Sequence, residues 1–447
     1  MLNYLDRYFG VTLAGSSLPR EARAALTTFL AMSYILIVNP QILSQAIVLA
    51  DGENASRQLM AATAIAAAIG CFIMGVFARY PIAVAPGMGL NAFFVFSVVL
   101  GRGVSWKVAL GAVFVSGIVF LMLSLSGFRE AVINSIPLSL KRAVGAGIGL
   151  FLAVIGLTSS GLIVANSTTL TTIGDLLTSA PLLMILGLIS AAVLSVKRIP
   201  GALLISISVV TILAISLNLP VYNGKVFEGS LATIVSLPEL PWDLLGAMDV
   251  KGALDISMLP VVFTFLFVAF FDTAGTLIAL CDKSGLSDSE GRIPRAAQVF
   301  TTDALATSIG AVLGTSTTTA YIESATGIED GGKTGLVAVV VGILFLVSLF
   351  FWPLFSLVPS VATAPALILL GAAMMESSVK INWRDYSEGV PAFLTIILMP
   401  LTWSISIGIS VGIISSVLIR VFSGKFREVS LTMYVLAIVL TIKMALG

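Results

Sequence analysis

Apolar stretches of about 20 residues recur from one end of this chain to the other, and this pattern constrains its fold more than any other feature. An α-helix needs about that length to cross the hydrocarbon core of a bilayer. Of the 447 residues, 58% are apolar and 11% are charged, whereas soluble domains carry about 25% charged residues. The apolar runs are continuous rather than alternating, which argues against a β-barrel. The sequence therefore predicts an all-α polytopic membrane protein.

We predict fourteen membrane spans, arranged as seven plus seven. With the N-terminus in the cytoplasm, 18 of the 24 Lys and Arg residues fall on the inner side and 5 on the outer side, with Lys443 unassigned. This asymmetry follows the positive-inside rule. The predicted spans are 22–48, 57–79, 82–100, 105–126, 142–158, 180–196 and 199–217, followed by 257–281, 297–313, 315–330, 334–352, 361–377, 387–401 and 404–423.

Three polar side chains, Asn91, Asp272 and Glu323, stand in the middle of these apolar runs. A carboxylate at bilayer depth costs about 2.5–3.5 kcal/mol on insertion scales, and such groups usually face a substrate or ion pathway. The chain has no histidine, so any coupling to protons must use carboxyl groups. Neither a metal site nor another cofactor is expected, and the net charge of +1 gives no indication of nucleic-acid binding.

An odd number of spans in each half predicts an inverted repeat, a common architecture of secondary transporters. Asn91 follows the stretch 85–90 (APGMGL) in the third span, and its tenth-span counterpart Glu323 follows 317–322 (TTTAYI). We predict in each an extended piece that leads into a half-helix whose free N–H groups point at a central site. Packed helices that Pro86 and the glycines merely kink would fit the same residues.

The two segments also resemble signatures of the AzgA-like purine permeases, within the nucleobase–cation symporter-2 or nucleobase-ascorbate transporter superfamily. The similar stretches occur in the family's order and extend over most of the chain: 31–36 (AMSYIL) with Asn39 and Pro40, 85–94 (APGMGLNAFF), 271–277 (FDTAGTL), 314–324 (GTSTTTAYIES) and 399–402 (MPLT). At position 269, where many relatives carry an additional Asp, this chain has Ala269. Because of that difference, the number of protons carried with each purine and the preferred purine stay open.

The resemblance implies a fold of core and gate domains and proton-coupled uptake of adenine, guanine or hypoxanthine. The implied setting is the inner (plasma) membrane, and a homodimer joined through the gate domain is expected. The predicted divisions are a cytoplasmic amphipathic segment 1–21, core 22–126, gate 127–217, an outer loop 218–256, core 257–352, gate 353–423 and an apolar or amphipathic segment 424–447, whose crossing of the membrane stays open.

The resemblance assigns Glu323 to substrate contact, because a carboxylate accepts from purine N–H groups. Asp272 has aromatic and branched neighbours, which suits a group that takes up and releases a proton; both acids are candidates for proton coupling. Asn91 can read a base edge without charge, although helix capping or packing would also explain it. Asp303 is expected to pack. Further substrate-binding candidates are Ala92, Phe94, Phe271, Thr276, Thr318, Tyr321 and Ile322.

We expect a purine base and a proton to bind between the half-helix tips and the eighth span, after which the core moves against the gate. An anion carrier of the sulfate or bicarbonate type, or a uracil or xanthine carrier, is the alternative. Two central acids argue against an anion carrier. A channel or a non-transporting receptor also stays open. With neither a histidine nor a phosphate-binding loop, an enzyme is not expected.

Overall fold

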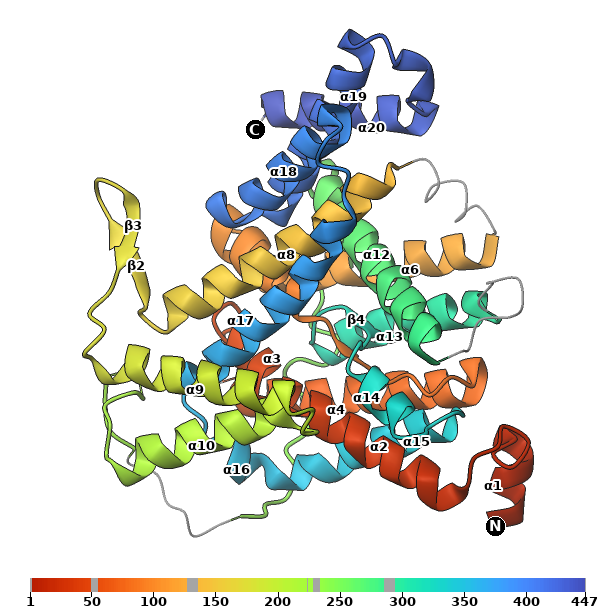
Figure 1. The fold of residues 1–447 in the computed structure, drawn as a ribbon, viewed down its shortest axis with the longest axis vertical. Coiled ribbons are helices and arrows are strands. Elements are labelled where there is room, and N and C mark those ends of the chain that lie inside the picture. The colour runs from red at the N-terminus through yellow and green to blue at the C-terminus, as the bar shows by residue number, and fades with distance from the viewer. Residues whose placement is uncertain are drawn as a thin grey trace.

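A computed structural model of the protein describes residues 2–49, 55–126, 136–222, 224–227, 234–284 and 294–446. The described chain is almost entirely helical (Figure 1), as the continuous apolar runs predict. The N-terminal elements are α1 (Leu2–Phe9), α2 (Leu18–Met32), α3 (Ile35–Leu43), α4 (Ser56–Ile73), η1 (Met74–Ala78), β1 (Val84–Pro86), α5 (Met88–Ala92), η2 (Phe93–Leu100), α6 (Trp106–Ser126), α8 (Leu138–Ser159), β2 (Ile163–Asn166), β3 (Leu170–Ile173), α9 (Ser179–Val196) and α10 (Ala202–Ser216).

The second half also consists of long helices, with the single short strand β4 among its described elements. Its elements are α11 (Val250–Ala253), η3 (Ile256–Met258), α12 (Leu259–Ser284), α13 (Ala296–Leu313), β4 (Thr318–Ala320), α14 (Ser324–Glu329), α15 (Leu336–Ser348), η4 (Leu349–Phe351), α16 (Trp352–Phe355), α17 (Ser360–Met375), η5 (Glu376–Lys380), α18 (Tyr386–Leu401), α19 (Ile405–Phe422), η6 (Phe426–Glu428) and α20 (Leu431–Leu446).

Ten helical segments within the described residues are long and apolar enough to cross a membrane. The predicted spans 82–100, 199–217 and 387–401 coincide with shorter apolar helices, Met88–Leu100, Ala202–Ser216 and Tyr386–Leu401. The predicted span 315–330 is instead a three-residue strand and the six-residue helix α14. Fourteen crossings therefore stay a prediction, although the segments that would supply them are present.

The helices pack in two groups. In the first, α15 lies against α2 and α4, α13 lies against α4 and α6, and α12 and α14 join them. In the second, α8 lies against α17 and α18, α9 lies between α10 and α17, and α19 packs on α18. Contacts between small residues bring helices together where lipid supplies no hydrophobic driving force, as at Gly149 and Gly371 between α8 and α17.

Two departures from the predicted spans concern local structure. The first span is not one helix, because α2 ends at Met32 and α3 begins at Ile35 after a turn through Ser33 and Tyr34. Between α8 and α9, the strands β2 and β3 form an antiparallel hairpin that the sequence analysis did not predict. This hairpin projects from the left of the molecule in Figure 1, opposite the side on which α1 lies.

Candidate functional site

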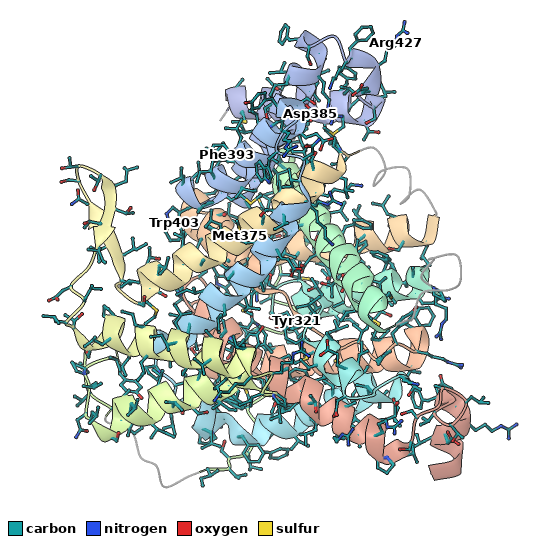
Figure 2. The ribbon with its side chains drawn as sticks, in the orientation of Figure 1. Tyr321, Met375, Asp385, Phe393, Trp403 and Arg427 are labelled. Atoms are coloured by element: carbon teal, nitrogen blue, oxygen red, sulfur yellow. The ribbon has the colours of Figure 1, made fainter. Side chains whose placement is uncertain are left out.

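The centre of the molecule is a two-stranded antiparallel sheet made from the two halves of the chain. Strand β1 pairs with β4 in the register Val84↔Ala320, Ala85↔Thr319 and Pro86↔Thr318. The pairing continues outward, since the Gly87 amide donates to the Thr317 carbonyl at 2.9 Å. Extended backbone cannot satisfy its polar groups in lipid, and pairing within the protein removes that cost. Figure 1 shows β4 in the interior, and Figure 2 places Tyr321 there as well.

A short helix follows each strand, so the predicted extended segments and half-helices are confirmed. Gly87 precedes α5, and Glu323 precedes α14. Asn91 is the fourth residue of α5, whereas Glu323 directly precedes α14. The interpretation of Asn91 and Glu323 as counterparts therefore stays a prediction, with the two residues in slightly different places relative to the helix starts.

Two of the predicted site residues, Asp272 and Glu323, come together at these tips. The Thr319 hydroxyl donates to Asp272 Oδ2 at 3.1 Å, which ties α12 to β4. Tyr34 donates its hydroxyl proton to Glu323 Oε1 at 2.6 Å. Both acids are half-buried, and their carboxyl groups lie close enough to act on one another electrostatically.

The tip of the third span also reaches this cluster. A methyl group placed on Gly87 would lie 3.2 Å from the Thr319 side chain and 3.8 Å from Asp272 Oδ2. A third acid, Asp303 on α13, is fully buried and accepts a hydrogen bond from Thr273, the residue after Asp272. Each of three acids thus accepts a hydrogen bond from a hydroxyl group: Asp272 on α12, Asp303 on α13 and Glu323 at the tenth-span tip.

Asn91 belongs to a second, fully buried polar cluster. Its amide nitrogen donates to Asn39 Oδ1 at 2.5 Å. Asn39 in turn donates to the hydroxyls of Thr63 at 2.7 Å and Thr315 at 3.0 Å. Within the described residues, no hydrogen bond joins Asn91 to Asp272 or Glu323. The Asn91 Oδ1 atom is buried and has no hydrogen-bond partner among those residues.

The remaining predicted site residues lie in different surroundings. Three of them, Ala92, Phe94 and Thr318, are fully buried, while Ile322 is 42% exposed. Tyr321 is buried and donates to the Pro86 carbonyl at 2.5 Å. Thr276 is half-buried, one turn beyond Asp272 on α12. The Phe271 side chain lies outside the part of the chain that the structure describes.

The face of α12 below Asp272 is open. Gly275 and Thr276 share that face, because side chains three and four residues apart are neighbours on a helix. Gly275 is exposed, and a methyl group added to it would meet no atom of the described residues within 4 Å. Within the described ranges, no group of three or more His, Cys, Asp or Glu side chains could hold a metal ion.

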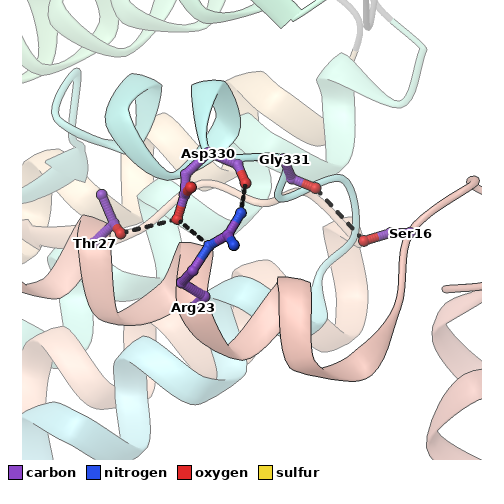
Figure 3. A network of polar contacts seen from close by, with 5 residues as sticks. All are labelled: Ser16, Arg23, Thr27, Asp330 and Gly331. Carbon is purple, nitrogen blue, oxygen red and sulfur yellow. Dashed lines mark hydrogen bonds and ion pairs between the residues drawn. The ribbon is translucent and has the colours of Figure 1, made fainter.

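Sequence reasoning did not identify Tyr34 and Asn39 as site residues, although the stretch that contains them was noticed. A useful signal was present, since Asn39 is an amide inside an apolar run, as Asn91 is. The far end of α14 is also fastened to the first span (Figure 3). There Arg23 pairs with Asp330 at 3.0 Å, Thr27 donates to the same carboxylate, and Ser16 donates to the Gly331 carbonyl.

Glu21 makes the buried part of this fastening. Its carboxylate is fully buried and accepts from the backbone amides of Lys333 at 3.0 Å and Thr334 at 3.1 Å. The Thr334 hydroxyl adds a third hydrogen bond at 2.7 Å. The tenth-span tip is therefore held at both ends by the first span, through Tyr34 at the site and Glu21 near the end of α14.

Comparisons with known proteins identify the family of this chain. A family model described as "Permease family" matches residues 20–411. The guanine/hypoxanthine permease PbuG of Bacillus subtilis is 46% identical over 97% of this chain and 98% of its own. The adenine permease AdeP of Escherichia coli is 42% identical over 98% of this chain and 95% of its own.

Solved structures share the fold at low sequence identity. The transmembrane domain of the bicarbonate transporter BicA of a cyanobacterium superimposes with a TM-score of 0.59 at 15% identity, over 86% of this chain and 96% of that one. The murine anion transporter Slc26a9 in its inward-facing state gives a TM-score of 0.64 at 12% identity, over 91% of this chain and 69% of that one. From the family match and its relatives, this chain belongs to the Permease family of membrane transporters and is not an enzyme.

Proposed function

We propose that this protein carries purine nucleobases, namely adenine, guanine or hypoxanthine, into the cell together with protons. The observation that carries the proposal is the half-buried Glu323 at the tip of α14, beside Asp272 and the Gly87 end of the third span. A carboxylate accepts purine N–H groups, while nearby hydroxyls and backbone amides serve ring nitrogens or an oxo group. The substrates named for PbuG and AdeP support this class of ligand.

Proton coupling is supported by the crowding of acids. Asp272 interacts electrostatically with both Glu323 and Asp303. Two neighbouring carboxylates do not ionise independently, because the charge on one disfavours the charge on the other. In the described part of the chain, the side chains that donate hydrogen bonds to these three acids do so through hydroxyl groups, and the backbone amides of Ala320 and Glu323 add bonds to Asp303 and Glu323. Binding a proton thus removes a costly charge from the interior before the site moves.

We propose that the first packing group is a core domain and the second packing group is a gate domain. During transport the core domain moves against the gate domain. The β1–β4 pairing and the hydrogen bonds to Asp272 and Glu323 lie within the first group. Such a unit can carry the bound base without dismantling the site. We further propose an inner-membrane location, a cytoplasmic N-terminus, fourteen spans and a homodimer that meets through the gate domain.

The test is uptake by purified protein in liposomes with an inward proton gradient. Glu323→Ala and Asp272→Asn should each reduce purine accumulation at least tenfold, since a hydrogen bond to a charged group contributes about 1.5–3 kcal/mol. Asp330→Asn is the matched control, because that acid forms a partly exposed ion pair away from the site. Near-normal accumulation in both site variants would refute the assignment.

A competition panel separates the substrate classes. Unlabelled adenine, guanine and hypoxanthine should displace labelled substrate, whereas bicarbonate and sulfate should not. Displacement only by xanthine and uracil would replace the purine assignment by the alternative carrier. Counterflow without a gradient distinguishes a carrier, which exchanges substrate, from a channel.

A further inference from the structure

The break in the first span delivers a tyrosine hydroxyl to the candidate site. Tyr34 stands in the turn between α2 and α3 and is fully buried. Its hydroxyl is only 2.6 Å from Glu323 Oε1. A short hydrogen bond to a carboxylate is stronger than one between neutral groups. Because the Tyr34 ring is enclosed by packed side chains, its hydroxyl has little freedom to turn away from this oxygen.

This contact gives the two carboxylate oxygens of Glu323 different hydrogen-bonding partners. Oε1 is engaged by Tyr34, and no other side chain among the described residues donates to the carboxylate. The Glu323 backbone amide adds one more hydrogen bond, which leaves lone pairs of the carboxylate for a ligand. Glu323 is half-buried, which leaves part of the side chain accessible. We infer that Tyr34 is a specificity-determining residue that fixes the Glu323 carboxylate with one oxygen directed at the base. The inference rests on the proposed purine transport and names what sets the preference among purines.

The hydrogen-bond donors of hypoxanthine and guanine differ, so this geometry discriminates between the two bases. Hypoxanthine presents one N–H group on its six-membered ring beside the oxo group. Guanine presents the same N–H group and an adjacent exocyclic amine, a pair that matches both oxygens of a carboxylate. While Tyr34 engages Oε1, the second donor of guanine must share that oxygen with the hydroxyl, which weakens the paired contact. The tyrosine therefore favours hypoxanthine relative to guanine, and its removal should reverse that bias.

The experiment measures KM and Vmax for hypoxanthine and guanine in liposomes with wild-type protein and Tyr34→Phe. We expect the ratio of the guanine KM to the hypoxanthine KM to fall about tenfold, because the second donor of guanine gains the oxygen that Tyr34 engaged and a hydrogen bond to a charged group contributes about 1.5–3 kcal/mol. Vmax should stay within about twofold, and the KM for guanine should fall. The matched control is Tyr222→Phe, since the Tyr222 hydroxyl donates to the Leu357 carbonyl at 2.8 Å, a contact that involves none of the site acids.

Two further measurements guard against a folding defect. Tyr34→Leu removes the hydroxyl with a different packing shape and should shift the guanine-to-hypoxanthine ratio in the same direction. Thermal stabilisation of the purified variants by each base reports binding without transport. An unchanged ratio in both variants while purine uptake persists, or the same shift in Tyr222→Phe, overturns the inference alone. A wild-type protein that transports adenine but neither guanine nor hypoxanthine also overturns the inference alone, and one that transports none of the three bases overturns the proposed function as well.

Discussion

The close packing of α8 against α17 predicts how much stability the protein loses when Gly149 is replaced by Ala. A methyl group on Gly149 would lie 2.6 Å from Met374 Cβ and 2.7 Å from the Gly371 carbonyl oxygen. Neither neighbour is the end of a flexible side chain, so Gly149→Ala must push two helices apart. One turn earlier on the same helix, a methyl group on Gly145 would meet the Ser377 Oγ at an ordinary 3.5 Å.

The two substitutions share every effect except this overlap. Each gains about 0.5–1 kcal/mol of helix propensity when Gly becomes Ala. Only Gly149→Ala also incurs overpacking, which costs about 1–3 kcal/mol. We therefore expect Gly145→Ala to be neutral or stabilising, and Gly149→Ala to be less stable than Gly145→Ala by about 1–3 kcal/mol.

The two buried cysteines supply the assay. Cys71 and Cys281 are 0% and 1% exposed, so a thiol-reactive dye labels them only as the protein unfolds. The apparent melting temperature of Gly149→Ala in detergent should fall several degrees below that of Gly145→Ala. Equal melting temperatures, or a higher one for Gly149→Ala, would show that α8 and α17 do not approach as closely as described.

Three other expectations use the same assay. Glu21→Ala should destabilise by about 1–3 kcal/mol for each buried donor it orphans, whereas Asp330→Ala, which breaks a partly exposed ion pair, should cost below about 1 kcal/mol; similar losses would contradict the contrast. Trp403 has a φ of 50°, so Trp403→Gly should be more stable than Trp403→Ala by about 1 kcal/mol despite its smaller side chain. Hydrogen bonds from Ser387 lower the pKa of Asp385, so its stabilisation is complete above the ordinary carboxyl pKa and is lost as the pH falls through the lowered value. The melting difference between wild type and Asp385→Ala should therefore shrink below about pH 4, and a constant difference would exclude this carboxylate as the cause.

Much of the fold could be predicted because apolar runs report burial in lipid directly. The interruptions at 84–92 and 318–329 were visible because Pro86, neighbouring glycines and a run of threonines disfavour helix. The break at Ser33 and Tyr34 was not visible, because neither Pro nor Gly marks it and the apolar run continues on both sides. At this place Tyr34 makes a tertiary contact, the hydrogen bond to Glu323, which the local sequence does not indicate.

The site could be predicted only in part for a related reason. Asp272 and Glu323 stand out because a carboxylate is rare in an apolar run, and the structure brings them together. Asn91 stands out equally, yet its partner Asn39 comes from another span and its cluster is separate from the acids. Tyr34 looked like ordinary aromatic packing in the sequence. Its role depends on where one oxygen atom points, which no spacing pattern encodes.

The pairing of β1 with β4 has a consequence for how the protein is made. Strand β1 leaves the ribosome long before β4, with most of the intervening helices inserted in between. During that interval its amide and carbonyl groups have no strand to bond with, and bare backbone of this kind is poorly tolerated among acyl chains. The nascent third span must therefore stay in a sheltered or hydrated environment until the tenth span is synthesised. If the second half of the chain is damaged, β1 remains unpaired, and the first half is open to recognition by quality-control proteases.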